Sequence, residues 1–137
     1  MPRIKPQIRK TVRERAAGRC KYCRSWEAYA SQPFEVDHII PSSRDGLTEL
    51  ENLAYACGGC NGHKHNKVEA LDPAENRSAP LFHPRKDNWL DHFSWNDDYS
   101  MILGTTPTGR ATVEALQLNR PGIINIRNLL RRAGLHP

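Results

Sequence analysis

Alternating apolar and polar residues predict a short strand in the first third of the chain. The alternation runs from Phe34 to Asp37, with the period of two that is typical of a half-buried strand. Pro41 ends the stretch, since proline has no N–H to donate to a neighbouring strand. Asp37 and His38 are therefore expected at a strand end, where side chains are held in place and remain accessible to a ligand.

The same reading of periodicity and terminal signals predicts the other elements. The predicted helices span residues 7–17, 61–71 and 123–132, and the predicted strands span residues 52–56 and 99–103. A further helix is expected to start at Thr106 and Pro107, which are residue types of an N-cap and a first helical position. A polar loop over residues 42–48 is expected to be exposed and free to touch a ligand.

The balance of charge favours a nucleic-acid partner. The 137 residues include 20 Lys and Arg against 15 Asp and Glu, a net charge of +5, and fourteen of the cations are arginine, which suits bidentate phosphate contacts. Between Arg3 and Arg15 six cations accompany one acid, Glu14, so a basic N-terminal arm or helix is expected. Elsewhere acids are interspersed, and ordinary solvated charge explains part of the excess. Without a run of 18 apolar residues or an apolar leader, a cytoplasmic protein with no membrane partner is expected.

All four cysteines fall in two C-x-x-C pairs, Cys20 with Cys23 and Cys57 with Cys60. In a reducing compartment such pairs indicate a metal site rather than disulfides, and four thiolates are the full ligand set of a structural Zn²⁺. A redox role is less favoured because no βαβ pattern surrounds either pair. With a hydrophobic content of 38%, a metal would supplement a small core.

The residues between and beside the cysteine pairs suit hydrolysis of a phosphodiester. Such a reaction needs a base for water and a hard cation beside the scissile phosphate. Asp37 and Asn61 supply a carboxylate and an amide oxygen, which are ligands for Mg²⁺. His38 can accept a proton from water near neutral pH. His63 and His65 lie close to Asn61, and either can replace or supplement it, or merely contact phosphate.

In order along the chain, C-x-x-C, V-D-H-I-x-P, E-N-L and C-x-x-C-N-x-x-K resemble the HNH endonuclease family with its ββα-metal finger. The matching motifs run from Cys20 to Lys64. The resemblance implies an α+β fold: a ββα finger stapled by the four-cysteine zinc site, with an N-terminal basic helix and a C-terminal strand and helix extension. The expected divisions are residues 1–19, 20–72 and 73–137, with the last packing on the core.

The resemblance also implies roles for the site residues. His38 is the expected general base, Asp37 and Asn61 the expected ligands of a catalytic Mg²⁺, Mn²⁺ or Ni²⁺, and Asn52 the residue that braces the connection between the strands. The expected contacts to nucleic acid, taken from the basic residues, are Arg13, Arg15, Arg44, Lys64 and Lys67.

Beyond Leu81 the motifs L-F-x-P-R, W-x-x-H-F-x-W and L-x-L-N-R-P resemble a segment of stand-alone bacterial and phage HNH proteins, to which no chemistry is assigned. Its aromatic residues, Trp89, Phe93 and Trp95, are expected to be core.

Two functions compete on this reading. The first is a metal-dependent endonuclease acting on DNA, expected to be double-stranded, although RNA is not excluded by the sequence. The second is a zinc-stabilised nucleic-acid-binding module without catalysis. The presence of Asp37, His38, Asn52 and Asn61 together favours the enzyme, since a degenerate finger is expected to have lost one of them.

Overall fold

The computed structural model describes residues 4–137, so the Arg3 end of the predicted basic arm lies outside the described residues. The chain divides into two compact units. Unit 1 comprises the described part of Met1–Val68 together with His83–Asp87, and unit 2 comprises Glu69–Phe82 together with Asn88–Pro137. The expected divisions at residues 19 and 72 remain predictions.

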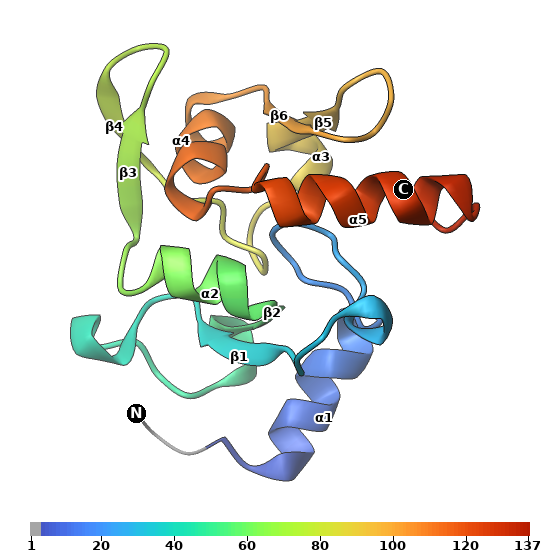
Figure 1. Ribbon diagram of the computed structural model, residues 1–137. Coiled ribbons are helices and arrows are strands. Elements are labelled where there is room, and N and C mark those ends of the chain that lie inside the picture. Colours follow the sequence, from blue (N-terminus) through green and yellow to red (C-terminus); the bar gives the residue numbers. More distant parts are fainter. Residues whose placement is uncertain (1–3) are drawn as a thin grey trace. The chain divides into compact units, whose positions relative to one another are not determined.

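The elements follow one another along the chain in mixed order (Figure 1). The helices are α1 (Pro6–Arg15), α2 (Gly58–Lys64), α3 (Trp89–His92), α4 (Pro107–Leu116) and α5 (Pro121–Arg132). The strands are β1 (Glu35–His38), β2 (Leu53–Ala56), β3 (Glu69–Asp72), β4 (Arg77–Pro80), β5 (Phe93–Trp95) and β6 (Ile102–Gly104). None of the helices in residues 4–137 is suited to cross a bilayer, since a span needs about 20 apolar residues.

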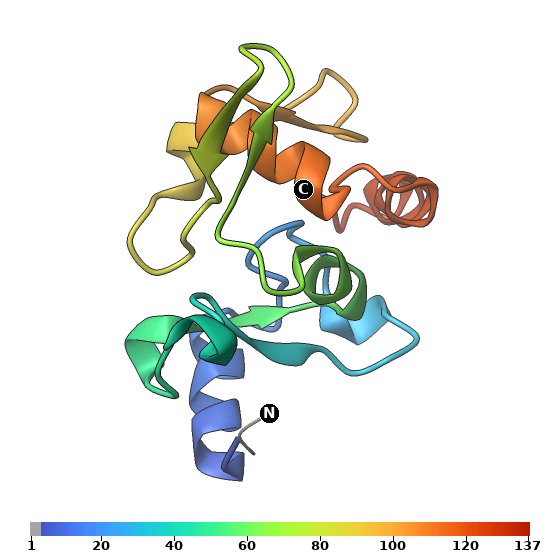
Figure 2. The same ribbon diagram turned by 90° about the vertical axis from the view of Figure 1, so that its left-hand side faces the viewer.

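Unit 1 is built on the antiparallel pair of β1 and β2. Val36 pairs with Tyr55 and Asp37 with Ala54, and all four residues of β2 are buried. The helix α1 packs against β2, and α2 packs against β1 (Figures 1 and 2). Val12 is the buried residue of α1. Two short strands and one short helix thus form an α+β core, as the sequence predicts.

The helix predicted over residues 61–71 is wrong in both boundaries. The helix α2 begins at Gly58, where Cys57 caps it by accepting a hydrogen bond from the Cys60 N–H, and it ends at Lys64. His65 stops it with a positive φ of 52°, a conformation that cannot continue a right-handed helix. Residues beyond it form β3, because their backbone pairs with β4 in a hairpin that the helical reading did not anticipate.

Unit 2 places two hairpins around α4. The strands β3 and β4 pair in one sheet and β5 and β6 in another, and α4 contacts both (Figure 2). Its core includes Phe82, Trp89 and Phe93, and the Phe93 ring centroid lies 5.3 Å from that of Phe82 and 5.0 Å from that of Trp89. The expectation that the aromatic cluster is core is confirmed for Trp89 and Phe93, whereas Trp95 is only half-buried.

The start of α4 confirms the prediction from Thr106 and Pro107, since the Thr106 side chain accepts a hydrogen bond from the Gly109 N–H. The predicted strand over residues 99–103 is wrong at its start. Tyr99 has a positive φ of 59° and lies in a turn, so β6 begins only at Ile102. The last helix begins two residues before the predicted 123, with Pro121 at its first position.

Candidate active site and metal centre

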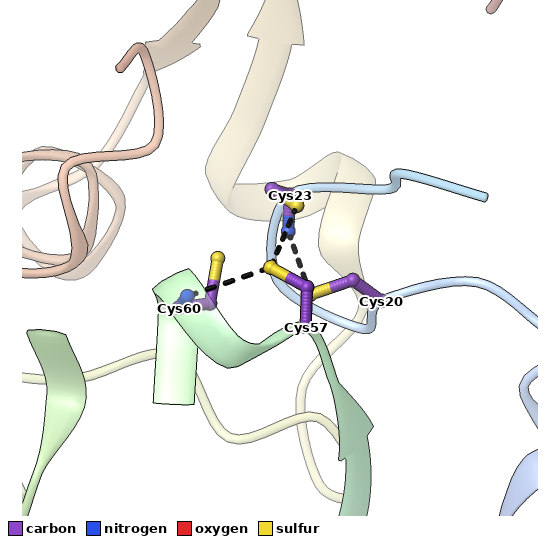
Figure 3. A group of neighbouring side chains, drawn as sticks. All are labelled: Cys20, Cys23, Cys57 and Cys60. Atoms are coloured by element: carbon purple, nitrogen blue, oxygen red, sulfur yellow. Dashed lines mark hydrogen bonds between the residues drawn. The ribbon is translucent and has the colours of Figure 1, made fainter. Parts of the chain in front are cut away.

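The four cysteines come together where the loop after α1 meets the start of α2 (Figure 3). Their sulfur atoms all lie within 4.8 Å of one another, and all four are free thiols. In each pair the first sulfur accepts a hydrogen bond from the backbone N–H of the second cysteine, at 3.5 Å for Cys20 and 3.4 Å for Cys57. Four cysteine sulfur atoms this close together match the ligand set of a structural zinc site.

The surroundings shift the pKa values of the Cys20 and Cys57 thiols in opposite directions. Burial raises the pKa of the Cys20 thiol, whereas hydrogen bonds from the other three cysteines lower the pKa of the Cys57 thiol. A thiolate at Cys57 is thus stabilised by its neighbours. Since the thiolate is the metal-binding form of cysteine, the cluster is prepared for a cation.

Asp37 is buried within β1 and has two side-chain partners. The Tyr22 hydroxyl donates to its Oδ2 at 2.7 Å, and the Lys64 ammonium lies 3.2 Å from its Oδ1. Lys64 also donates to the His38 backbone carbonyl at 3.1 Å. Burial raises the pKa of Asp37, and the charge of Lys64 opposes that effect.

The expectation that Lys64 contacts phosphate is wrong for this structure. Its side chain is 1% exposed, because α2 directs it under β1 to Asp37. An ammonium in that position compensates a buried carboxylate instead of meeting a solvent-exposed ligand.

His38 is buried at the end of β1, and its Nε2 lies 2.9 Å from the Thr48 hydroxyl. Among the described residues its Nδ1 is buried without a hydrogen-bond partner. Burial lowers the pKa of His38, and Lys64 adds to that effect against the opposing charge of Asp37. The imidazole is therefore neutral at pH 7, and when Nε2 carries the proton, Nδ1 keeps a lone pair.

Asn52 lies just before β2 and ties down the loop that follows β1. Its Oδ1 accepts from the Ile40 N–H at 2.8 Å, and its Nδ2 donates to the carbonyls of Ile40 and Leu47, both at 2.9 Å. Leu47 precedes Thr48 in the chain, so the same side chain holds the backbone next to the partner of His38.

Asn61 projects from α2 toward β1, and its Nδ2 donates to the Glu35 carboxylate. Because a carboxylate accepts only from the nitrogen end of an amide, this bond orients the Asn61 oxygen away from Glu35. A fixed orientation matters, since only the oxygen of the amide binds a hard cation.

Asp37, His38 and Asn61 all line one cavity of about 540 Å³. It is lined by Val36, Asp37, His38, Pro41, Ser42, Ser43, Asn61, Gly62, His65 and Asn66. Of the two histidines that the sequence left open, His65 lines this cavity and His63 does not. His65 also carries the strained φ described above, and such strain is common at functional sites.

The remaining basic residues differ in what they contact. Arg13 makes an ion pair with Glu27 at 3.0 Å, and Arg15 donates to the backbone carbonyls of Leu50 and Leu53. Arg44 and Lys67 are exposed, and Arg44 donates to the carbonyl of Asn66, which lines the cavity. Arg44 thus lies at the rim of the cavity, whereas Arg15 braces the backbone before β2.

Sequence reasoning missed three side chains that hold the site: Tyr22, Glu35 and Thr48. Glu35 belongs to the alternating stretch and shares a face with Asp37, which is the one signal that was available. Tyr22 and Thr48 carry no local signal, because their roles depend on distant partners.

Comparison with known proteins agrees with the geometry in one segment of the chain. Residues 20–67 match the family model for HNH endonuclease. No curated protein and no solved structure matches the chain. The matched segment contains the four cysteines, β1, β2 and α2.

Proposed function

We propose that the protein is a metal-dependent endonuclease that hydrolyses DNA phosphodiester bonds, because residues 20–67 match the family model for HNH endonuclease and contain the four-cysteine cluster. The observation that carries the proposal is the convergence of Asp37, His38 and Asn61 on one cavity from two different elements. A strand and a helix hold a base and two oxygen donors together, which is the arrangement that the reaction needs.

His38 acts as the general base. Its Nδ1 is a buried nitrogen without a partner among the described residues, and a reacting water is a suitable partner for it. Thr48 holds the opposite side of the ring through Nε2, which orients the imidazole. The lowered pKa of His38 keeps it in the neutral form that can take a proton at pH 7.

Asp37 and Asn61 are the residues that would hold a divalent cation such as Mg²⁺, Mn²⁺ or Ni²⁺. The donor set fits, because a carboxylate oxygen and an amide oxygen are hard ligands, and the Glu35 bond orients the amide. When bound, the cation supplies positive charge beside the scissile phosphate. The Lys64 ammonium lies 3.2 Å from Oδ1, where its charge opposes the rise in the Asp37 pKa that burial causes and holds the carboxylate in position.

The cysteine cluster would hold a structural Zn²⁺, and its ligands would join the chain before β1 to the start of α2. The exposed cations Arg13, Arg44 and Lys67 would contact the phosphate backbone, with Arg44 at the rim of the cavity. Contacts of that kind position a duplex without reading its sequence. By analogy with the family, the products would carry a 5′-phosphate and a 3′-hydroxyl.

One observation favours the alternative of a binding module without catalysis. The Asp37 carboxylate already has a cation, Lys64, and the pair is buried. If Lys64 satisfies Asp37 completely, no divalent ion binds and no bond is cut.

Incubation of supercoiled plasmid with the purified protein tests the proposal. Mg²⁺, Mn²⁺ or Ni²⁺ is added in separate reactions, with EDTA as the control, and nicked or linear DNA is expected only with metal. Sealing of the nicks by DNA ligase checks the 5′-phosphate and 3′-hydroxyl ends. Binding of DNA without cleavage under all three metals would support the binding module instead.

A further inference from the structure

The Asp37 carboxylate is bonded at both oxygens, and both donors come from segments that carry the cysteine pairs. Tyr22 stands inside the first C-x-x-C pair, and its hydroxyl donates to Asp37 Oδ2 at 2.7 Å. Lys64 follows the second pair by one turn of α2, and its ammonium donates to Oδ1 at 3.2 Å. Each cysteine pair thus brings one donor to one oxygen of the same carboxylate.

The backbone around Tyr22 fixes its position. The side chain is fully buried. The neighbouring Lys21 N–H donates to the Tyr55 carbonyl at 2.9 Å, which ties this turn to β2. The sulfur atoms of Cys23 and Cys57 lie 3.7 Å apart, so the turn also adjoins the start of α2 (Figure 3). The hydroxyl therefore reaches Asp37 from a segment that two other elements hold in place.

Two donors orient a carboxylate and still leave it able to bind a cation. An ionised carboxylate has about four lone pairs, of which Tyr22 and Lys64 use one on each oxygen. The torsion that turns an aspartate carboxyl group has a broad energy profile, so the group rotates unless hydrogen bonds hold it. Asp37 lines the cavity together with His38 and Asn61. The direction of its remaining lone pairs in that cavity thus depends on the two donors.

We propose that Tyr22 is a positioning residue, which holds the Asp37 carboxylate in the orientation that binds the catalytic cation and so couples the cysteine cluster to the reacting site. The inference rests on the proposed function, since that function places a divalent cation at Asp37. It adds a role for the side chain inside the first cysteine pair. It also implies that loss of order at the cysteine cluster weakens cation binding at Asp37.

A purely structural role for Tyr22 makes a different prediction. In that role the ring fills the core beside the cysteines, and the hydroxyl serves only to satisfy a buried carboxylate. Loss of the hydroxyl would then lower the stability of the protein and leave its affinity for a divalent cation unchanged. Tyr22→Phe separates the two roles, because it removes one oxygen atom and keeps the ring.

Tyr55 offers a matched control. It is also a fully buried tyrosine, and its hydroxyl also donates to a carboxylate oxygen, Glu27 Oε2, at 2.5 Å. Neither Tyr55 nor Glu27 lines the cavity around His38. Tyr55→Phe therefore loses the same kind of hydrogen bond at a carboxylate outside the cavity.

The experiment uses the full chain, loaded with zinc and carrying His38→Ala, so that DNA is not cut. Mn²⁺ is titrated into its mixture with a short duplex, and electron paramagnetic resonance measures the free Mn²⁺, with the duplex alone as background. Tyr22→Phe is expected to weaken Mn²⁺ binding about tenfold, within the range for groups that hold a metal ligand in place. Tyr55→Phe is expected to bind Mn²⁺ as the parent does, and the zinc content is expected to be equal in all three proteins.

Cleavage by the same variants with His38 intact adds a second measurement. Tyr22→Phe is expected to raise the Mn²⁺ concentration for half-maximal cleavage about tenfold and to recover most of the parent rate at saturating Mn²⁺.

The outcomes distinguish the inference from the proposed function. Mn²⁺ binding by Tyr22→Phe that equals or exceeds that of Tyr55→Phe would overturn the inference and leave the function standing, and so would loss of zinc from Tyr22→Phe, which would assign the structural role. Weaker Mn²⁺ binding by Tyr22→Phe, in a protein whose parent never cuts DNA, would overturn the hydrolysis and leave the inference standing. A parent that binds Mn²⁺ no better than Asp37→Ala would overturn both.

Discussion

The Lys64 ammonium lies 3.2 Å from the Asp37 carboxylate, and the two side chains are 1% and 4% exposed. Their attraction has little solvent to screen it, and Lys64 also donates to the His38 carbonyl. The pair therefore links α2 to the end of β1, where the general base lies. At His38, burial lowers the pKa more than the charge of Asp37 raises it, and the charge of Lys64 adds to the lowering.

We expect Lys64→Met to destabilise unit 1 by about 3–5 kcal/mol, the cost of leaving a buried charge without its partner. Urea denaturation of the zinc-loaded protein, followed by circular dichroism, measures the change. Lys67→Met is the control, because Lys67 is exposed. The double change Asp37→Asn with Lys64→Met is expected to recover part of the loss. A loss below about 1 kcal/mol for Lys64→Met would show that the pair contributes as little as a surface ion pair.

His38→Ala is expected to lower plasmid cleavage by about 100-fold or more, the scale for losing a positioned base. The zinc content and DNA affinity of His38→Ala are expected to equal those of the parent. His63→Ala is the control, and its cleavage activity is expected to equal that of the parent, because His63 does not line the cavity. The pH profile of the parent adds a second check. Because the pKa of His38 is lowered from 6.5, cleavage is expected to fall only as the pH drops below that value. Equal rates for His38→Ala and the parent would contradict the role of the base.

Much of the finger was predictable because its signals are local. The two C-x-x-C pairs, the alternation that ends at Asp37 and His38, and the cap at Thr106 all depend on residues within a few positions of one another. The structure brings the cysteines together and gives Thr106 its hydrogen bond, so those two predictions are confirmed.

What could not be predicted depends on contacts between distant segments. Lysine usually lies on the surface, and Lys64 is buried only because α2 packs on β1. That packing brings it to Asp37, which is 27 positions away in the sequence. The residues after His65 have enough helical propensity to extend α2, but pairing of β3 with β4 overrides it. The return of His83–Asp87 to unit 1 has no local signal at all.

The cysteine cluster is expected to bind one Zn²⁺ per chain, with a contribution to folding on the order of 10 kcal/mol. Any one of Cys20→Ser, Cys23→Ser, Cys57→Ser or Cys60→Ser is expected to unfold unit 1, because the core around β1 and β2 is small. Metal analysis of the purified protein, with circular dichroism before and after a strong chelator, tests this. Folded protein free of zinc, or a disulfide within either pair, would refute the assignment.

Asn52→Ala is expected to release the loop after β1, because three hydrogen bonds to Ile40 and Leu47 are lost at once. Buried backbone groups left unpaired cost about 1–3 kcal/mol each, so a measurable fall in stability is expected. Cleavage is expected to fall as well, since Thr48 no longer holds the His38 ring in place. Asn52→Asp keeps the acceptor for the Ile40 N–H and loses the two hydrogen bonds that Nδ2 donates. If the three bonds contribute independently, its stability is expected to lie between those of the parent and Asn52→Ala.

Glu27 makes the stability of unit 1 sensitive to acid. Burial alone would raise its pKa, but hydrogen bonds from the Tyr55 hydroxyl at 2.5 Å and the Phe34 N–H at 2.8 Å, with the charges of Arg13 and Arg9, lower it below 4.5. A carboxylate whose pKa is lowered by folding stabilises the protein above its unfolded pKa, and that stabilisation is lost as the pH falls through the native value.

We therefore expect Glu27→Gln to be less stable than the parent at pH 7. The difference is expected to shrink once the pH falls below 4.5 and to vanish below the lowered native pKa, where folded Glu27 is protonated and resembles the amide. Urea denaturation at pH values from 7 to about 3 measures the two stability curves. Glu14→Gln is the control, since its pair with Lys10 is 66% exposed at both side chains and should shift the curve little. A difference between Glu27→Gln and the parent that stays constant over the whole range would mean that Glu27 acts through its shape and hydrogen bonds and not through its charge.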